Sequence, residues 1–189
     1  MTGVKAPRMI FATVGSSPVG FARMMEALEA VPPGELTVQH GPAPAPPGAT
    51  GHDFLPFGRI VDLMRAADVV VSHAGVGSIM CALQAGHQPI VFPRYERFGE
   101  TVDDHQAELA SALAERGTVI VASSGEELLQ AIASVPPRGH QRVLHGQELN
   151  AAVRAAIHGE RPRTLKRALS SQETENHGAH PSPPTVPAH

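Results

Sequence analysis

The residues best suited to bind a ligand or take part in a reaction lie in one short segment, at positions 73–78, where histidine, glycine and serine follow an apolar run. The valines at 69–71 are β-branched and do not alternate with polar residues, which predicts a strand buried on both faces of a parallel sheet. Gly75 and Gly77 permit a sharp turn, and Ser78 begins a helical pattern. A glycine turn at the start of a helix presents free backbone N–H groups and the positive end of the helix dipole. The segment therefore predicts a phosphate-binding turn.

A second glycine-bearing turn, Gly15-Ser16-Ser17-Pro18, follows an apolar run at residues 9–14 that predicts the first strand. Ser16 or Ser17 can cap the next helix, and Pro18 suits the first turn of that helix. In a parallel sheet of this kind, ligands bind beyond the carboxyl ends of the strands. The two glycine turns are therefore expected to meet at one cleft.

Two common phosphate-binding motifs do not fit this chain. A dinucleotide-binding fold needs G-x-G-x-x-G after the first strand and an acidic residue about 20 positions later. Here the G-x-G follows a late strand, Met80 stands in place of the third glycine, and Arg97 stands where the acidic residue belongs. The P-loop pattern G-x-x-x-x-G-K-[ST] is absent from the sequence. These observations disfavour NAD binding and P-loop nucleotide binding.

Each of these residues also has a purely structural interpretation. The turn at 73–78 could be only a tight connection, His73 a buried structural histidine, and Ser78 a helix cap. Cys81 is expected to be a small core or cleft residue and not a catalytic thiol, because no activating base is identifiable. The eleven histidines are scattered and lack the spacing of metal ligands, so no metal site is expected.

The composition sets wide limits on function. The chain has 189 residues, a net charge of -3 and one cysteine. This length accommodates one α/β domain and a tail. The slightly negative net charge does not indicate binding to nucleic acid. A single cysteine excludes an internal disulfide, and no apolar run approaches the roughly 20 residues that cross a bilayer. A cytoplasmic location is expected.

Apolar patterns alternate between strand and helix spacing along the chain. Strands are expected at residues 9–14, 36–40, 69–72, 89–92 and 119–121. Helices are expected from residue 21 up to the prolines at 32 and 33, and then at 60–67, 77–85, 103–116, 126–133 and 141–157. The alternation predicts an α/β fold, a Rossmann-like parallel sheet with helices on both faces. Residues 41–51 are rich in proline and are expected to form a surface loop.

The chain is expected to divide into one domain and a tail. Residues 1–158 contain all the predicted strands and helices and would form a single Rossmann-like domain. From Gly159 the sequence is rich in proline, serine, histidine and charged residues and holds little that could be buried. Residues 159–189 are therefore predicted to be a disordered tail.

The order of the motifs resembles the nucleotide-sugar-binding half of GT-B glycosyltransferases, of the family 28 C-terminal domain type. The motifs are TVGSS at 13–17, FLPF at 54–57, HAGVGS at 73–78, IVFPR at 90–94 and GETVDDHQ at 99–106, and the likeness covers residues 9–135. Within this group the chain looks most like the small soluble subunit of two-part enzymes. One such enzyme adds the second GlcNAc to the dolichol-linked precursor in eukaryotes, and others are bacterial exopolysaccharide transferases.

The resemblance implies which residues would hold the diphosphate of the donor: His73 and the backbone amides of Gly75, Val76, Gly77 and Ser78. Arg94, directly after a strand-ending proline, could also reach the diphosphate. The turn at Gly15 and Ser16 would face the diphosphate–sugar side of the donor or the acceptor. A helix N-terminus and a donor imidazole can stabilise the charge on a departing nucleoside diphosphate, so no cofactor is implied.

The resemblance also implies contacts for the two ends of the donor. Gln106, with Asp104 or His105 beside it, would face the sugar hydroxyls. Phe57 and the backbone around it would border the uracil. The same residues have structural interpretations as well, because a glutamine early in a helix is usually solvated and an aspartate there can serve the helix dipole.

A complete GT-B enzyme has two Rossmann-like halves, and this chain is long enough for one. The resemblance therefore implies the donor-binding subunit of a glycosyltransferase that works with a membrane-attached, acceptor-binding subunit. It would move a hexosyl group from a UDP-sugar to a lipid-linked saccharide, as in exopolysaccharide assembly, and the general base would lie on the partner. The alternative is a non-catalytic nucleotide-sugar-binding or scaffolding module.

The sequence departs from the family pattern at Cys81. Many members of the wider superfamily carry a glutamate three residues after the serine of this turn, where it holds the ribose hydroxyls. The bacterial exopolysaccharide subunits also tend to lack that glutamate. The cysteine therefore favours the branch of the bacterial exopolysaccharide subunits. It does not identify the residue that contacts the ribose, and it is also compatible with the scaffolding alternative.

Overall fold

The computed structural model describes residues 8–136, 150, 151 and 153–155. Within these residues the strands form one six-stranded sheet, and each neighbouring pair of strands is parallel. The strands are β1 (Ile10–Thr13), β2 (Leu36–Gln39), β3 (Thr50–His52), β4 (Val69–His73), β5 (Ile90–Phe92) and β6 (Ile120–Val121). The parallel sheet predicted from the sequence is therefore confirmed.

The order of the strands reverses at the middle of the sheet. It runs β3-β2-β1-β4-β5-β6, so the chain first builds outward from β1 and then resumes at β4 on the other side of β1. In the register, Ile10 of β1 lies between Leu36 of β2 and Val69 of β4. Such a reversal leaves a crevice outside the carboxyl ends of the two central strands, where ligands of open α/β sheets bind. Thr13 and His73 end these strands, so both glycine turns leave the sheet at this crevice.

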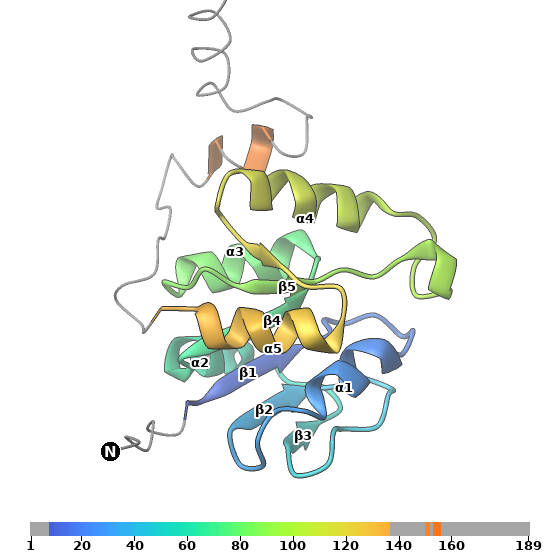
Figure 1. Ribbon diagram of the computed structural model, residues 1–189, viewed down its shortest axis with the longest axis vertical. Coiled ribbons are helices and arrows are strands. Elements are labelled where there is room, and N and C mark those ends of the chain that lie inside the picture. The colour runs from blue at the N-terminus through green and yellow to red at the C-terminus, as the bar shows by residue number, and fades with distance from the viewer. Residues whose placement is uncertain (1–7, 137–149, 152, 156–189) are drawn as a thin grey trace, which may run out of the picture.

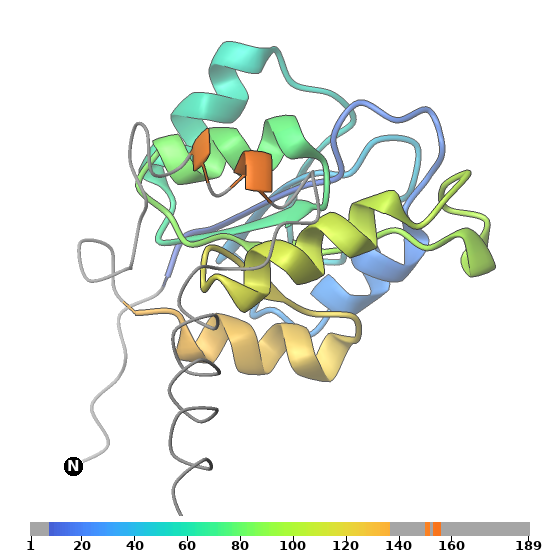
Figure 2. The ribbon, with the colours of Figure 1, turned by 90° about the horizontal axis from the view of Figure 1, so that it is seen from above.

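Helices connect the strands in the described part of the chain (Figure 1). They are α1 (Ala22–Leu28), α2 (Phe57–Ala66), α3 (Val76–Gln84), α4 (His105–Glu115) and α5 (Gly125–Ser134), with a short 3-10 turn η1 (Glu96–Phe98) between β5 and α4. Figure 2 shows α2 and α3 on one side of the sheet and α1 and α5 on the other. The prediction of helices on both faces is confirmed.

Strand side chains alternate between two buried layers. Ile10 and Ala12 of β1 pack in the cluster formed with α1 and α5. Phe11, between them, points to the opposite face and packs with Met64 of α2 and Ala82 of α3. These side chains are essentially inaccessible to water. The central strands of the sheet are covered on both faces, which explains the continuous apolar runs in the sequence.

Helix α4 packs beside α3 on the second face. Leu113 of α4 lies in one buried cluster with Leu83 of α3 and Val91 of β5. Val153, in a helical stretch near the end of the described residues, joins the same cluster. This packing fixes the axis of α4 and thereby directs its first turn toward the carboxyl edge of the sheet.

Strand β3 lies inside the segment that was expected to be only a surface loop. Residues 50–52 are threonine, glycine and histidine, and they pair with β2 through Thr37, Val38 and Gln39. They are exposed or half-buried and carry no apolar alternation, so this edge strand is held by backbone pairing. The loop prediction for 41–51 is therefore wrong at its last two residues, because the strand has no hydrophobic signature.

Helix α1 begins at Ala22 with Phe21 as its N-cap residue, so the prediction that Ser16 or Ser17 caps it and that Pro18 lies in its first turn is wrong.

Two further helices begin two or three residues from their predicted starts, whereas α3 and α5 begin within one residue of theirs. Helix α2 starts at Phe57, three residues before the predicted start at 60, with Pro56 as its extended N-cap residue. Helix α4 starts at His105, because Asp104 is the N-cap residue and Asp103 precedes it. The final helix predicted at 141–157 is helical at residues 150, 151 and 153–155, and its other residues lie outside the described part.

The predicted tail at 159–189 also lies outside the described residues. Among the helices that the structure describes, none combines the length and apolar character needed to span a bilayer.

Candidate functional site

Two cavities open at the carboxyl ends of β1 and β4, and Ser16 lines both of them. We call the first the apolar cavity; it measures about 320 Å³. Its apolar wall consists of Phe54, Leu55, Phe57, Ile60, Met64 and Cys81, and its polar wall of Thr13, Gly15, Ser16, Gln39, Gly77 and Ser78. The second, the polar cavity, measures about 390 Å³ and is lined by Ser16, Ser17, Val19, His73, Arg94, Glu100, Thr101, Val102 and Gln106. The structure thus brings both predicted turns to adjoining cavities.

A buried hydrogen-bond network fixes the turn after β1. The backbone N–H of Gly15 donates to Oγ1 of Thr13 at 3.1 Å, and this hydroxyl in turn donates to Oε1 of Gln39 at 3.1 Å. The side-chain amide of Gln39 donates to the carbonyl of Gly15 at 2.9 Å. Gly15 has φ of 76°, a conformation that favours glycine. Thr13 and Gln39 were not predicted as site residues; the signal in the sequence was a polar residue at the end of each apolar strand.

The ring of His73 lies between the two glycine turns. A Cβ atom added to Gly15 or to Gly75 would overlap this ring, which explains glycine at both positions. Burial is the main cause that lowers the pKa of His73, to about 4, and the nearby positive charge of Arg94 lowers it further. A backbone hydrogen bond at Thr13 raises the pKa by a smaller amount. The imidazole is therefore neutral at pH 7. Its Nδ1 atom is buried and has no hydrogen-bond partner within the described residues.

Helix α3 begins without a side-chain cap. Its N-cap residue is Gly75, and the carbonyl of Gly75 accepts the first helical hydrogen bond, from the backbone of Ile79 at 3.0 Å. Ser78 is the third residue of the helix, so the alternative that it is only a cap is wrong. The first N–H groups of a helix have no partner within it, and those of Gly77 and Ser78 belong to residues that line the apolar cavity. Val76 is 41% exposed and lines neither cavity.

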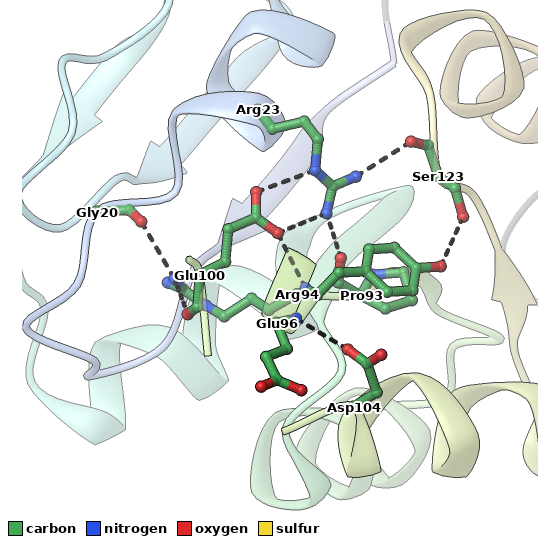
Figure 3. A network of polar contacts seen from close by, with 9 residues as sticks. Gly20, Arg23, Pro93, Arg94, Glu96, Glu100, Asp104 and Ser123 are labelled. Atoms are coloured by element: carbon green, nitrogen blue, oxygen red, sulfur yellow. Dashed lines mark hydrogen bonds and ion pairs between the residues drawn. The ribbon is translucent and has the colours of Figure 1, made fainter. Parts of the chain in front are cut away.

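Arg23, from α1, holds the segment between β5 and α4 (Figure 3). Its Nε and Nη2 atoms bind Oε1 and Oε2 of Glu100 at 3.0 and 2.8 Å. It also donates to the backbone carbonyls of Pro93 and Ser123. The backbone N–H of Tyr95 donates to Oε2 of Glu100 at 3.0 Å. One arginine thus joins α1, the end of β5 and the connection that leads to α5.

Aromatic rings surround the same guanidinium. Its central carbon lies 4.6 to 5.4 Å from the ring centroids of four residues, Phe92, Phe98, Tyr95 and Phe21. Such contacts favour a cation over the face of a ring. Arg23 was not predicted as a site residue, because its partners lie some 70 to 100 positions away in the sequence.

Arg94 lines the polar cavity and is only 2% exposed. Its Nη1 atom donates to the carbonyls of Gly20 at 3.2 Å and Glu100 at 3.3 Å. The guanidinium stacks on Phe21, with 4.3 Å between its central carbon and the ring centroid. The structure places Arg94 beside His73 and Gln106, and not among the residues that line the apolar cavity with Gly77 and Ser78.

The polar cluster before α4 divides between the cavity and the surface. Gln106 lines the polar cavity, and its Oε1 atom is buried without a partner in the described part of the chain. Asp104 is the N-cap residue and accepts a hydrogen bond from the backbone of Glu96 at 2.9 Å. His105 points outward, and a hydrogen bond to Glu108 with the charge of Asp103 raises its pKa. Asp104 and His105 line neither cavity.

Cys81 lies in the wall of the apolar cavity, as expected for a cleft residue. Burial raises the pKa of its thiol, so the thiol stays protonated at pH 7. A protonated thiol is a weak hydrogen-bond partner, and Cys81 therefore gives this wall an apolar character.

The sequence profile of the glycosyltransferase family 28 C-terminal domain matches residues 35–158. The chain belongs to this family. The matched segment contains the turn at 73–78, the buried Arg94 and the start of α4, whereas β1 and its glycine turn precede it. The family resemblance predicted from the motifs is confirmed. A search of curated protein sequences gives no match.

Solved structures of glycosyltransferases share the fold. The calicheamicin glycosyltransferase CalG4 is 14% identical with a TM-score of 0.52, and the glycotransferase of kitacinnamycin is 20% identical with a TM-score of 0.51. Each comparison covers 90% of this chain and 43% of the other, so this chain spans less than half the length of these relatives. The solution structure of ALG13 is also similar, at 19% identity and a TM-score of 0.49, over 71% of this chain and 90% of that one. The domain has the fold of one GT-B half.

Replacing Gly75 by alanine is expected to destabilise the protein, because the new methyl group would overlap the ring of His73. Overpacking of this kind costs about 1–3 kcal/mol of unfolding free energy. Gly77→Ala is the matched control, since a Cβ there meets no atom within 4 Å and the residue is helical. Urea unfolding measures both. Equal stability of the two variants would contradict the placement of His73 between the glycine turns.

The buried, neutral His73 predicts a specific pH dependence of stability. The unfolded histidine binds a proton below its ordinary pKa of about 6.5, whereas the folded one binds it only near pH 4, so stability is lost as the pH falls between these values. Between pH 7 and 4.5 the loss from this residue is about 2–3 kcal/mol. Urea unfolding at both pH values checks this against His73→Gln, which lacks the titrating group. Parallel losses in both proteins would show that His73 is not buried in its neutral form.

Proposed function

We propose that this chain is the donor-binding subunit of a glycosyltransferase. It binds a UDP-sugar and moves the hexosyl group to a lipid-linked saccharide, together with a membrane-attached subunit that binds the acceptor at the cytoplasmic face. The observation that carries the proposal is the pair of adjoining cavities, one apolar and one polar, on either side of the Gly15–Ser16 turn. A nucleoside diphosphate sugar likewise has a flat base at one end and a polar sugar at the other, with the charged diphosphate between them.

The apolar cavity suits the nucleoside. Phe57 is 68% exposed at its wall, and Phe54 is 54% exposed beside it. Exposed aromatic rings at a cavity are platforms on which a base can stack. Cys81 offers no strong acceptor to the ribose, so the ribose hydroxyls would bind to groups in the polar wall of the same cavity, such as Ser78.

The diphosphate would lie at the start of α3. The N–H groups of Gly77 and Ser78 and the positive end of the helix dipole favour an anion at this position. His73, neutral and close by, can donate one N–H to the same group. These donors stabilise the negative charge that develops on the departing nucleoside diphosphate, which is how electrostatic preorganisation lowers a barrier.

The partner subunit would cover this edge of the sheet. Val19 and Val102 line the polar cavity and are 45% and 89% exposed, and Phe98 nearby in the sequence is 54% exposed. Exposed apolar side chains gathered around a site are typical of interaction surfaces. The match covers 43% of each of two glycosyltransferases that share the fold. In the proposal, the acceptor-binding half supplies the general base.

The second candidate is a non-catalytic nucleotide-sugar-binding or scaffolding module. The cysteine at position 81, where many relatives of the wider superfamily carry the ribose-binding glutamate, favours it.

Phe57→Ala is expected to weaken UDP binding about tenfold, because stacking of a base on an aromatic ring contributes about 1–3 kcal/mol. Phe98→Ala is the matched control, since Phe98 is similarly exposed but lines neither cavity. Isothermal titration calorimetry measures both affinities. An equal loss in the two variants, or no UDP binding by the wild-type chain, would contradict the assignment of the apolar cavity to the nucleoside.

Transfer of a labelled sugar from UDP-sugar to a lipid-linked saccharide distinguishes the two candidates. We expect transfer when this chain and its acceptor subunit are combined, none with either alone, and a large loss in the complex that carries His73→Ala. A complex that binds the UDP-sugar but transfers nothing would support the scaffolding module. Turnover by this chain alone would show that the two-subunit proposal is wrong.

A further inference from the structure

We propose that Arg94 selects a donor whose sugar carries a carboxylate, that is, a nucleoside-diphosphate uronic acid, by binding that carboxylate in the polar cavity. This inference rests on the proposed donor site and names the class of sugar that the site takes.

Within the part of the chain that the structure describes, one edge of the Arg94 guanidinium has no protein acceptor. Among the described residues, its Nη1 atom donates to two backbone carbonyls, whereas Nε and Nη2 are buried and have no hydrogen-bond partner. These two nitrogens lie on the same edge of the planar group and point their N–H bonds in one direction. Buried donors without acceptors are costly and rare in folded proteins. An acceptor that the ligand supplies would satisfy both.

The neighbouring arginine shows what fits this edge. Arg23 uses its Nε and Nη2 atoms to bind both oxygens of the Glu100 carboxylate, at 3.0 and 2.8 Å (Figure 3). Two parallel hydrogen bonds to a carboxylate are the geometry that a guanidinium favours. Arg94 lines the polar cavity, and its Nε and Nη2 atoms lie below the surface of that wall, so a carboxylate that binds this edge must displace neighbouring atoms to reach it.

The charges around the polar cavity leave one positive charge in excess. Arg23 and Arg94 are both cationic, His73 is neutral at pH 7, and Glu100 is the one acid among the residues that line the cavity. The Glu100 carboxylate binds Arg23 and the backbone of Tyr95, while Arg94 contacts only the backbone carbonyl of Glu100. The charge of Glu100 also favours the Arg94 cation, but two arginines share this one carboxylate. An anionic ligand would therefore stabilise this arrangement.

The position of Arg94 favours the sugar over the diphosphate as the source of that anion. The diphosphate has its backbone donors at Gly77 and Ser78, which line the apolar cavity, whereas Arg94 does not line that cavity. His73, which lines the polar cavity, supplies the remaining proposed donor to the diphosphate. Arg94 lies instead with Gln106, whose buried Oε1 atom can accept a hydrogen bond from a sugar hydroxyl. A neutral hexose has a hydroxymethyl group where the uronic acid has its carboxylate, and a single hydroxyl oxygen can accept from both N–H groups only through bent bonds. A carboxylate accepts both.

The direct test compares ligands on the wild-type chain. Isothermal titration calorimetry of the full chain with UDP, UDP-glucose and UDP-glucuronate is expected to show glucuronate binding at least about tenfold more tightly than glucose. UDP-glucose and UDP-glucuronate differ only at the group that Arg94 is proposed to contact. This comparison needs no variant and does not depend on whether a variant folds.

Arg94→Lys separates charge from geometry. The lysine keeps the positive charge but lacks the two parallel N–H donors, so the preference for glucuronate is expected to fall to about twofold or less while UDP affinity stays within about threefold. Arg97→Lys is the matched control, because Arg97 is exposed and lines neither cavity. It is expected to keep the full preference.

Three results would overturn the proposal, and they differ from one another. A wild-type chain that binds UDP but does not prefer glucuronate would refute the carboxylate site and leave the donor site intact. An Arg94→Lys variant that loses affinity for UDP as much as for UDP-glucuronate would assign Arg94 to the diphosphate. A wild-type chain that binds none of the three ligands would contradict the donor site itself.

Discussion

The arrangement of the site depends first on the ion pair between Arg23 and Glu100. The segment after β5 leaves the sheet at Pro93 and must return to begin α4, and Arg23 holds it at both its start and its middle. Glu100 is only 8% exposed, so loss of Arg23 would leave a buried carboxylate without its cation, a change that costs several kcal/mol in other proteins. Arg94 and Gln106 stand near the two ends of this anchored segment. Their place in the polar cavity therefore follows from a contact made by α1.

A second constraint joins the two glycine turns. The ring of His73 fills the space that side chains at Gly15 and Gly75 would occupy, so the turns after β1 and β4 are held at a fixed separation. The hydrogen bonds among Thr13, Gln39 and Gly15 fix the first turn from the opposite side. The cavities adjoin at the first of these turns, because Ser16 lines both of them. The proposed separation of nucleoside and sugar into two cavities is a consequence of this geometry.

The sequence predicted what is local and did not predict what joins distant segments. Val69–Val71 and the glycines after them indicated a buried strand and a turn, because apolar runs and glycine act within a few residues. Strand β3 was missed because Thr50–His52 lacks apolar alternation. The family motif grouped Asp104, His105 and Gln106, but the phase of the helix turns Gln106 into the cavity and His105 to the surface. Arg23 gave no signal, since its role exists only once α1 packs beside the end of β5.

If one ligand spans both cavities, its nucleoside diphosphate and its sugar should change the chemical shifts of two different groups of residues. Backbone amide chemical shifts of isotope-labelled protein, titrated with UDP and then with a UDP-sugar, test this most directly. UDP is predicted to shift the amides of Gly77, Ser78 and Phe57, and the attached sugar is predicted to add shifts at Thr101 and Gln106, across the Gly15–Ser16 turn. Shifts confined to residues outside the two cavities, or no difference between UDP and the UDP-sugar at the polar cavity, would contradict a single donor site built across both.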